Sequence, residues 1–228
     1  MSQVLFKKAI QAINEQGILL TFPINNRKEP GSLWSALFPR SEMRWEWSEF
    51  ADDRVGQLWR IREELSRSSQ VVYSKWYQGR ATFFSKEAFA HLLASQNAVQ
   101  QRGQLNYPEG RLIIEALEID SPLSTRQLKE VAELKGKSFE ALYNRVMKEL
   151  WWSGLIVGFG EIEDSSFPSL AVGATSALFE EIWAQGQEFT TARSKIWLEK
   201  KLGPQNLFFK ALEKGQKLSH IKKALRNS

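Results

Sequence analysis

The chain has 228 residues, of which 43% are hydrophobic and 25% charged, a composition that is ordinary for a globular protein long enough to bury a core. The absence of cysteine excludes disulfides, thiol nucleophiles and cysteine-ligated metal centres, and with only two histidines we expect no metal site and no cofactor. No apolar run approaches the roughly 20 residues that span a bilayer, and the N-terminus lacks the layout of a signal peptide. We therefore expect a soluble cytoplasmic protein without membrane contact.

The first third of the chain predicts two amphipathic helices separated by a strand and an irregular segment. Apolar residues repeat at helical spacing over residues 3–16, and the run ILLTFPI at 18–24 is typical of a strand. After a polar loop and an aromatic-rich segment, residues 52–68 predict the second helix. Arg62 lies on the apolar face of this helix, so we expect it to be partly buried.

Acidic residues cluster around the tryptophans that precede this second helix. A carboxylate beside tryptophan rings can have a raised pKa and act as a general acid or base. Glu46 lies between Trp45 and Trp47 and is the catalytic candidate on these grounds. The same acids can instead cap the helix and pair with Arg44, with no part in catalysis.

Residues 71–85, VVYSKWYQGRATFFS, predict a β-hairpin with Gln78-Gly79 at its turn. Lys75 and Arg80 are interleaved with aromatic residues in this hairpin. Such an arrangement can stack bases and hold phosphates, so both are candidates for nucleic-acid binding. A half-buried hairpin needs the same aromatic residues for packing alone, and this alternative stays open.

The next two segments predict a buried helix and a linker. Ser85 is a candidate cap for a helix at 86–96, and His91 lies beside core positions of that helix, which favours a structural role. Residues 95–110 are polar, rich in glutamine and punctuated by glycine, so we interpret them as a linker.

The most informative stretch follows the linker and contains three short helices and two strands. The predicted elements are helices at 111–120, 124–134 and 139–154, and strands at 155–163 and 169–175. Ser124 is an N-cap candidate for the second helix, Gly136 can end it, and Ser138 can cap the third. This order predicts a winged helix-turn-helix, in which the third helix enters the DNA major groove.

The exposed face of the third predicted helix carries residue types that contact nucleic acids. Arginine reaches guanine, asparagine reaches adenine, and lysine contacts mainly phosphate. The candidates in and just before this helix are Lys135, Lys137, Ser138, Asn144, Arg145 and Lys148. Asn144 and Arg145 are the candidates for base edges. A solvated helix face and a protein-contact surface are the alternatives, because Glu140 and Glu149 lower the local positive charge.

The C-terminal part predicts further helices and holds most of the excess positive charge. Residues 188–228 contain ten Lys or Arg and three Glu, in a chain of net charge +5. Lys210, Lys214 and Lys217 share a helical face and complete the set of nucleic-acid-binding candidates. A solvated tail would show the same pattern, and so would a basic amphipathic helix that lies on a membrane surface or docks in a partner groove.

Two runs of the chain carry a family resemblance, STRQLKEVAELKGKSFEALYNRVMKELWWSGLIVGFGE at 124–161 and REELSRSSQVVYSKWYQGRATFFS at 62–85. They resemble the AlkZ/YcaQ family of bacterial DNA glycosylases, and the whole chain resembles the shorter AlkZ-related branch. The resemblance implies winged helices and a β-barrel that cradle DNA. It also implies excision of alkylated or crosslinked bases by water positioned on a Gln-x-Gln or Gln-x-Asp element. Here only Gln185-Gly186-Gln187 has these letters, at a helix end beyond the predicted wing. DNA binding is therefore the more direct implication.

Together the patterns predict a mostly helical α+β fold with three parts. These are an aromatic-rich N-terminal domain with a β-hairpin at 1–103, a winged helix-turn-helix at 104–175, and a basic helical extension at 176–228. We expect a DNA-binding protein related to repair glycosylases. A divergent base-excision hydrolase and a non-enzymatic protein-interaction module are the alternatives, and the oligomeric state stays open.

Overall fold

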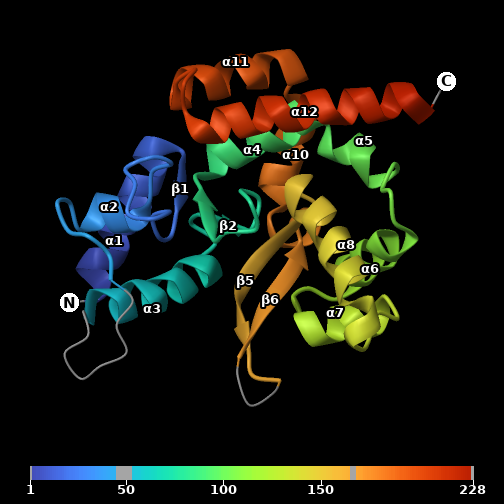
Figure 1. The fold of residues 1–228 in the computed structure, drawn as a ribbon, viewed down its shortest axis with the longest axis horizontal. Coiled ribbons are helices and arrows are strands. Elements are labelled where there is room, and N and C mark those ends of the chain that lie inside the picture. The colour runs from blue at the N-terminus through green and yellow to red at the C-terminus, as the bar shows by residue number, and fades with distance from the viewer. Residues whose placement is uncertain (1, 45–52, 165–167, 227–228) are drawn as a thin grey trace.

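The computed structural model describes residues 2–44, 53–164 and 168–226, which form a mixed, mostly helical α+β fold (Figure 1). The N-terminal elements are α1 (Ser2–Gln16), β1 (Ile18–Leu20), α2 (Leu33–Leu37), α3 (Asp53–Arg67), β2 (Val72–Ser74), β3 (Thr82–Phe84), α4 (Lys86–Gln96) and α5 (Ala98–Arg102). The middle elements are α6 (Pro108–Ile119), β4 (Leu123–Ser124), α7 (Thr125–Val131), the 3-10 turn η1 (Lys137–Phe139), α8 (Glu140–Trp152), β5 (Ile156–Ile162) and β6 (Ser169–Ala174). The C-terminal elements are α9 (Thr175–Leu178), α10 (Glu180–Glu188), α11 (Thr191–Leu202) and α12 (Leu207–Arg226). Glu46, the catalytic candidate, lies outside the described residues.

The strands of the described residues form one sheet in the order β1-β3-β2-β5-β6-β4, in which every neighbouring pair is antiparallel. The predicted hairpin is confirmed as β2 and β3, with Tyr73 opposite Phe83. β2 also meets β5, where Tyr73 lies opposite Gly158. The sheet is therefore continuous from the N-terminal segment into the ribbon β5–β6 that follows α8 (Figure 1).

Three groups of buried apolar side chains hold the helices against this sheet. One lies around α1 and α3 and includes Leu58, and a second surrounds α4 and includes Phe89. The third lies among α6, α7 and α8 and includes Val146. All three of these side chains are fully buried, and each such burial stabilises the fold by roughly 1.5–3 kcal/mol. α11 and α12 lie across α4 and close the second group (Figure 1).

α7 and α8 start in different ways. The predicted cap at Ser124 is confirmed, because its Oγ accepts from the Gln127 backbone N–H at 3.2 Å while the Gln127 side chain accepts from the Ser124 N–H at 2.8 Å. The predicted cap at Ser138 is wrong. Gly136 has a positive φ of 99°, and the Phe139 N–H donates to the Gly136 carbonyl at 3.1 Å. The resulting 3-10 turn leads into α8, whose N-cap Phe139 makes no side-chain hydrogen bond.

The segment at 95–110, which we predicted to be a linker, contains helical structure. α5 occupies residues 98–102, and α6 begins within the segment at Pro108, a favoured first residue for a helix. Ala98 and Leu105 are buried. Their burial explains the difference, because packing of a few apolar residues overrides an otherwise polar composition.

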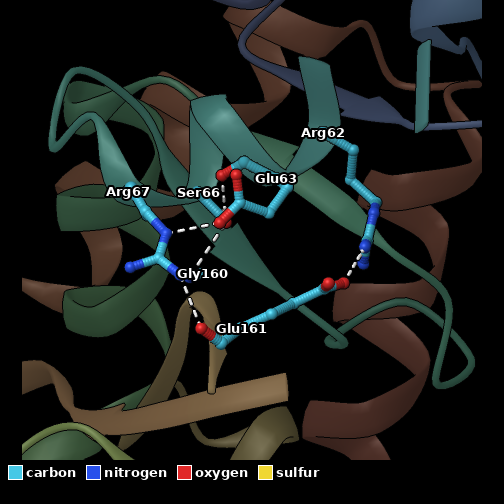
Figure 2. A network of polar contacts seen from close by, with 6 residues as sticks. All are labelled: Arg62, Glu63, Ser66, Arg67, Gly160 and Glu161. Atoms are coloured by element: carbon cyan, nitrogen blue, oxygen red, sulfur yellow. Dashed lines mark hydrogen bonds and ion pairs between the residues drawn. The ribbon is translucent and has the colours of Figure 1, made fainter. Parts of the chain in front are cut away.

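A polar network fastens α3 to the bulged part of β5 (Figure 2). Arg62 forms an ion pair with Glu161, and Arg67 donates to the Glu161 carbonyl at 2.5 Å. The Ser66 hydroxyl accepts from the Gly160 N–H at 3.0 Å. Arg62 is 8% exposed, as its place on the apolar face predicted. The network therefore fixes the ribbon relative to the helix that leads into the hairpin.

Candidate nucleic-acid interface

A cavity of about 650 Å³ lies between the loop that joins β2 to β3 and one side of α8. We call it the loop–helix cleft. The loop contributes Lys75, Trp76 and Gln78, and the helix contributes Asn144, Lys148 and Trp152, with Ala211 of α12 at the edge. Three residues predicted from two distant segments, Lys75, Asn144 and Lys148, are thus brought together.

Aromatic contacts hold the loop in place on both sides. The rings of Trp76 and Trp152 are stacked, with centroids 5.0 Å apart and planes 13° apart. Tyr77 meets Phe208 of α12 edge to face, with centroids 5.0 Å apart. Pairs of this kind contribute about 0.5–1.5 kcal/mol beyond the area they bury. The loop is therefore pinned between α8 and α12.

The tip of the loop adopts the turn that the sequence predicted. Gln78 and Gly79 both have positive φ, at 53° and 71°, and the Arg80 N–H donates to the Tyr77 carbonyl at 2.9 Å. Gln78 is exposed and lines the cleft. Arg80 is also exposed but does not line it. The loop thus presents an amide to the cleft and a guanidinium beside it.

Lys75 is the half-buried cation of the cleft. Burial lowers its pKa, and the positive charge of Arg62 lowers the pKa further. Among the residues that the structure describes, no carboxylate forms an ion pair with Lys75. A cation held in this way would gain from an anionic ligand, because the ligand's charge would replace the missing counter-charge.

The two acidic residues at the ends of α8 contact neighbouring elements. Glu140 forms an ion pair with Lys129, and Glu149 accepts from the Asn106 backbone N–H at 3.0 Å. These two acids are engaged by neighbouring elements. Within the described ranges, Lys137 and Lys148 are exposed and make no ion pair. Arg145 is exposed as well, and its Nε donates to the Ala141 carbonyl at 3.2 Å.

Two other candidates before α8 contribute differently. Lys135 pairs with Glu130 at 2.8 Å, so part of its charge is already balanced on the protein. Ser138 is exposed within the 3-10 turn. Lys135 lies between α7 and the 3-10 turn, and neither residue lines the cleft.

The three tail lysines that the sequence predicted lie on α12, which meets α8 at Gly215. Gly215 of α12 packs against Trp152 so closely that an added Cβ would lie 2.0 Å from the ring atom Cζ2. Lys210 and Lys214 directly precede Ala211 and Gly215, and both are exposed, as is Lys217. Lys210 Nζ donates to the Gln205 side chain at 2.5 Å. The three lysines are thus exposed on α12, the helix that also contributes Ala211 to the cleft.

A family model described as AlkZ related matches residues 5–207, which is most of the chain. The chain belongs to the AlkZ-related family. Comparison with curated proteins and with solved structures gave no significant match.

In this AlkZ-related chain, the letters Gln185-Gly186-Gln187 lie in the last turns of α10. Gln185 and Gln187 are exposed and do not line the cleft, while Gly186 is buried against Leu93.

None of the described helices is long and apolar enough to cross a membrane.

The sequence patterns did not identify most residues that line the cleft, among them Gln78, Trp151 and Trp152. The available signal was the tryptophan pair at the end of a predicted helix together with Trp76 in the predicted hairpin.

His91 has a structural setting, as predicted. Its ring stacks between Phe189 and Trp197, and its Nδ1 lies 3.0 Å from the buried Ser194 Oγ.

Proposed function

We propose that the protein binds DNA, with α8 as the recognition helix of a winged helix-turn-helix and the loop–helix cleft as a second contact. The observation that carries this proposal is the convergence of Lys75 with Asn144 and Lys148 on one cleft. Basic and amide side chains from separate elements then face one ligand. Duplex DNA offers both phosphates and base edges to such a surface.

The order of elements supports the winged-helix assignment. α6, β4, α7, α8, β5 and β6 follow one another in the chain, and β4, β6 and β5 are neighbouring antiparallel strands. In a winged helix, the third helix of this order is the one that enters the major groove. The exposed residues of α8 are then placed to contact DNA.

Roles for the individual side chains follow from their exposure and charge. Lys137 and Lys148 would contact phosphates, and Asn144 and Arg145 would reach base edges. Lys75 and Arg80 would hold the strand that passes the hairpin loop, and Lys210, Lys214 and Lys217 would extend the contact along α12.

Membership of the AlkZ-related family supports the proposal that the protein binds DNA as part of DNA repair. Because DNA is the proposed partner, a cytoplasmic location is part of the same proposal. Whether the chain excises bases is a separate matter, since Gln185 and Gln187 lie away from the cleft.

Fluorescence anisotropy on a labelled mixed-sequence duplex at several salt concentrations tests the proposal. Affinity should fall as the salt concentration rises, which gives a negative slope of log affinity against log salt concentration. Lys137→Ala and Lys148→Ala should each make this slope shallower by about 0.9, because each removes one phosphate contact. Arg145→Ala should relax sequence preference. The matched control is Lys7→Ala with Lys8→Ala on α1, which should leave binding unchanged. No binding at low salt, or slopes that do not change in well-folded variants, would overturn the proposal.

A further inference from the structure

Lys75 has surroundings that contact with a phosphate alone does not explain. The side chain lines the loop–helix cleft and is half-buried there. Within the part of the chain that the structure describes, its ammonium group has no carboxylate as an ion-pair partner, and Glu161 pairs with Arg62. An exposed lysine such as Lys148 is sufficient to hold a phosphate, so the burial of Lys75 points to a different use of its amine.

The same surroundings favour the neutral amine of Lys75. Burial lowers the pKa of Lys75, and the positive charge of Arg62 lowers the pKa further. A lysine is a nucleophile only as the free amine, and proteins favour that form by desolvation in an apolar pocket or by a neighbouring cation. Both causes act on Lys75. Lysines in such settings form imines with carbonyl compounds.

The backbone that carries this amine is held in a fixed place. Trp76, the next residue in the chain, stacks on Trp152 of α8 with 5.0 Å between the ring centroids. Tyr77 meets Phe208 of α12 edge to face. The loop is therefore fixed against two helices on the C-terminal side of Lys75. A nucleophile on a fixed backbone loses less conformational freedom when it reacts, which favours the reaction.

The cleft beside Lys75 has room for a small organic ligand with a negative charge. Its volume of about 650 Å³ falls within the range of roughly 300–1,000 Å³ that is typical of pockets for such ligands. Met147 and Trp151 add to its apolar wall. Lys148 lines the same cleft, is exposed and makes no ion pair with the described residues. A ligand with a carbonyl group for Lys75 and a phosphate for Lys148 therefore matches both amines.

We propose that the Lys75 side chain forms an imine with a phosphate-bearing aldehyde that enters the loop–helix cleft. The lone pair of Nζ attacks the carbonyl carbon, and a carbon–nitrogen bond forms. The carbinolamine that results loses the former carbonyl oxygen as water, which carries away the two hydrogens of the amine. No oxidant or reductant is consumed, and hydrolysis of the imine reverses the step.

The required chemistry is found in a free aldehyde such as pyridoxal 5′-phosphate and in a DNA strand with an abasic position. At such a position the ring-opened deoxyribose is an aldehyde that lies between two phosphates. The inference assigns a covalent reaction to Lys75, whereas the proposed function gives this residue only a charge. It does not require that the protein bind DNA.

Reductive trapping on the full chain tests the inference with the free aldehyde. The wild-type protein is mixed briefly with pyridoxal 5′-phosphate and sodium cyanoborohydride, which reduces an imine to a stable secondary amine, and the modified lysines are mapped by mass spectrometry. Lys75 should be labelled at least about threefold faster than the exposed Lys8 and Lys137, because its free amine is favoured. This comparison is made within one folded protein, so it does not depend on a variant.

A duplex with one abasic position tests the DNA source under the same reducing conditions. A covalent protein–DNA adduct on a denaturing gel should form with the wild-type protein and with Lys8→Arg. It should be lost in Lys75→Arg, which keeps the positive charge but has no amine to form the imine, and whose melting temperature is compared with that of the wild-type protein. Labelling of Lys75 by pyridoxal 5′-phosphate without a DNA adduct would support the inference with a free aldehyde as the ligand.

The result that overturns the inference is the absence of preferred labelling at Lys75 together with no DNA adduct that depends on Lys75. Anisotropy on the unmodified duplex reports on DNA binding separately. Loss of that binding would overturn the proposed function and leave the reaction of Lys75 with pyridoxal 5′-phosphate unaffected. The two failures are therefore distinguishable.

Discussion

The indole rings of Trp76 and Trp152 stack with 5.0 Å between their centroids and 13° between their planes. One ring belongs to the β2–β3 loop and the other to the last turn of α8. Lys75, which directly precedes Trp76, and Lys148, one helical turn before Trp152, both line the cleft and are proposed to contact DNA. An uncharged contact therefore joins the two elements that carry these cations.

Replacing Trp152 should weaken DNA binding without removing a charge. In Trp152→Leu the loop loses its stacking partner, so Lys75 and Gln78 are no longer held opposite α8. We expect the affinity for DNA to fall roughly threefold to tenfold and the free energy of unfolding to fall by about 1–3 kcal/mol. The salt slope of binding should change less than in Lys148→Ala, because every cation remains and only Lys75 loses its fixed position. Trp152→Phe should recover part of both losses, and a salt slope that falls as in Lys148→Ala would contradict this account.

Gly215 should tolerate no larger side chain. The Cβ added in Gly215→Ala would lie 2.0 Å from Trp152, inside van der Waals contact, so α12 or the indole ring must move. We expect the free energy of unfolding to fall by about 1–3 kcal/mol, measured by chemical denaturation. The matched control is Gly56→Ala in α3, where the nearest atom to a new Cβ is 3.8 Å away. That substitution should be neutral or stabilise by up to about 1 kcal/mol. Equal effects at the two glycines would contradict the packing described here.

The α3–β5 network should contribute measurably to stability. Glu161→Ala leaves the nearly buried Arg62 without its carboxylate, and we expect the free energy of unfolding to fall by about 1–3 kcal/mol. Part of the effect is screened, because the Glu161 side chain is 26% exposed. Glu163→Ala removes an exposed acid just beyond β5 and serves as the control, with an expected change of less than about 0.5 kcal/mol. Indistinguishable denaturation midpoints for the two variants would show that the network adds little.

His91 should make stability depend on pH. Burial lowers the pKa of His91 and the Arg193 charge lowers it further, while Glu87 opposes the shift. The folded state therefore favours the neutral ring, and the unfolded state takes up a proton at a higher pH, near the ordinary histidine value of about 6.5. The contribution of neutral His91 to the free energy of unfolding is fully present above the pKa of the unfolded state. It declines as the pH falls from there toward the lowered folded pKa.

Denaturation of the wild-type protein and of His91→Gln between pH 5 and pH 8 measures this contribution. The wild-type protein should lose stability on acidification over the lower part of this range, and the loss should be smaller in His91→Gln, which cannot take up the proton. His220 is present in both proteins, so its contribution cancels. Parallel pH profiles for the two proteins would mean that His91 titrates alike in the folded and unfolded states.

Local patterns predicted most of the elements, because their causes are local. Ser124 caps α7 through residues only three positions away, and Gly154 ends α8 with a positive φ of 71°. The 3-10 turn at Ser138 was missed because a backbone hydrogen bond, rather than the serine side chain, satisfies the start of α8. The short strand β4 was not predicted, because a strand of two residues is too short to show an alternation of apolar and polar residues.

The cleft could not be predicted from the sequence, for a physical reason. Asn144 and Lys148 were identified from the face of one helix, and Lys75 from the composition of one hairpin. Their meeting depends on the pairing of Tyr73 with Gly158 and on the stacking of Trp76 on Trp152, both of which are contacts between distant segments. Sequence periodicity describes which face of an element is buried, and it does not say which partner covers that face.

Photo-crosslinking tests the central claim most directly, because it reports which residues DNA touches. p-Benzoylphenylalanine is introduced singly at Gln78 in the loop, at Asn144 on α8 and at Gln187 on α10, all of which are exposed positions. With a radiolabelled DNA duplex, our account predicts efficient crosslinks from positions 78 and 144 and little from position 187. Crosslinks from position 187 with none from 78 or 144 would contradict the loop–helix cleft as the DNA contact.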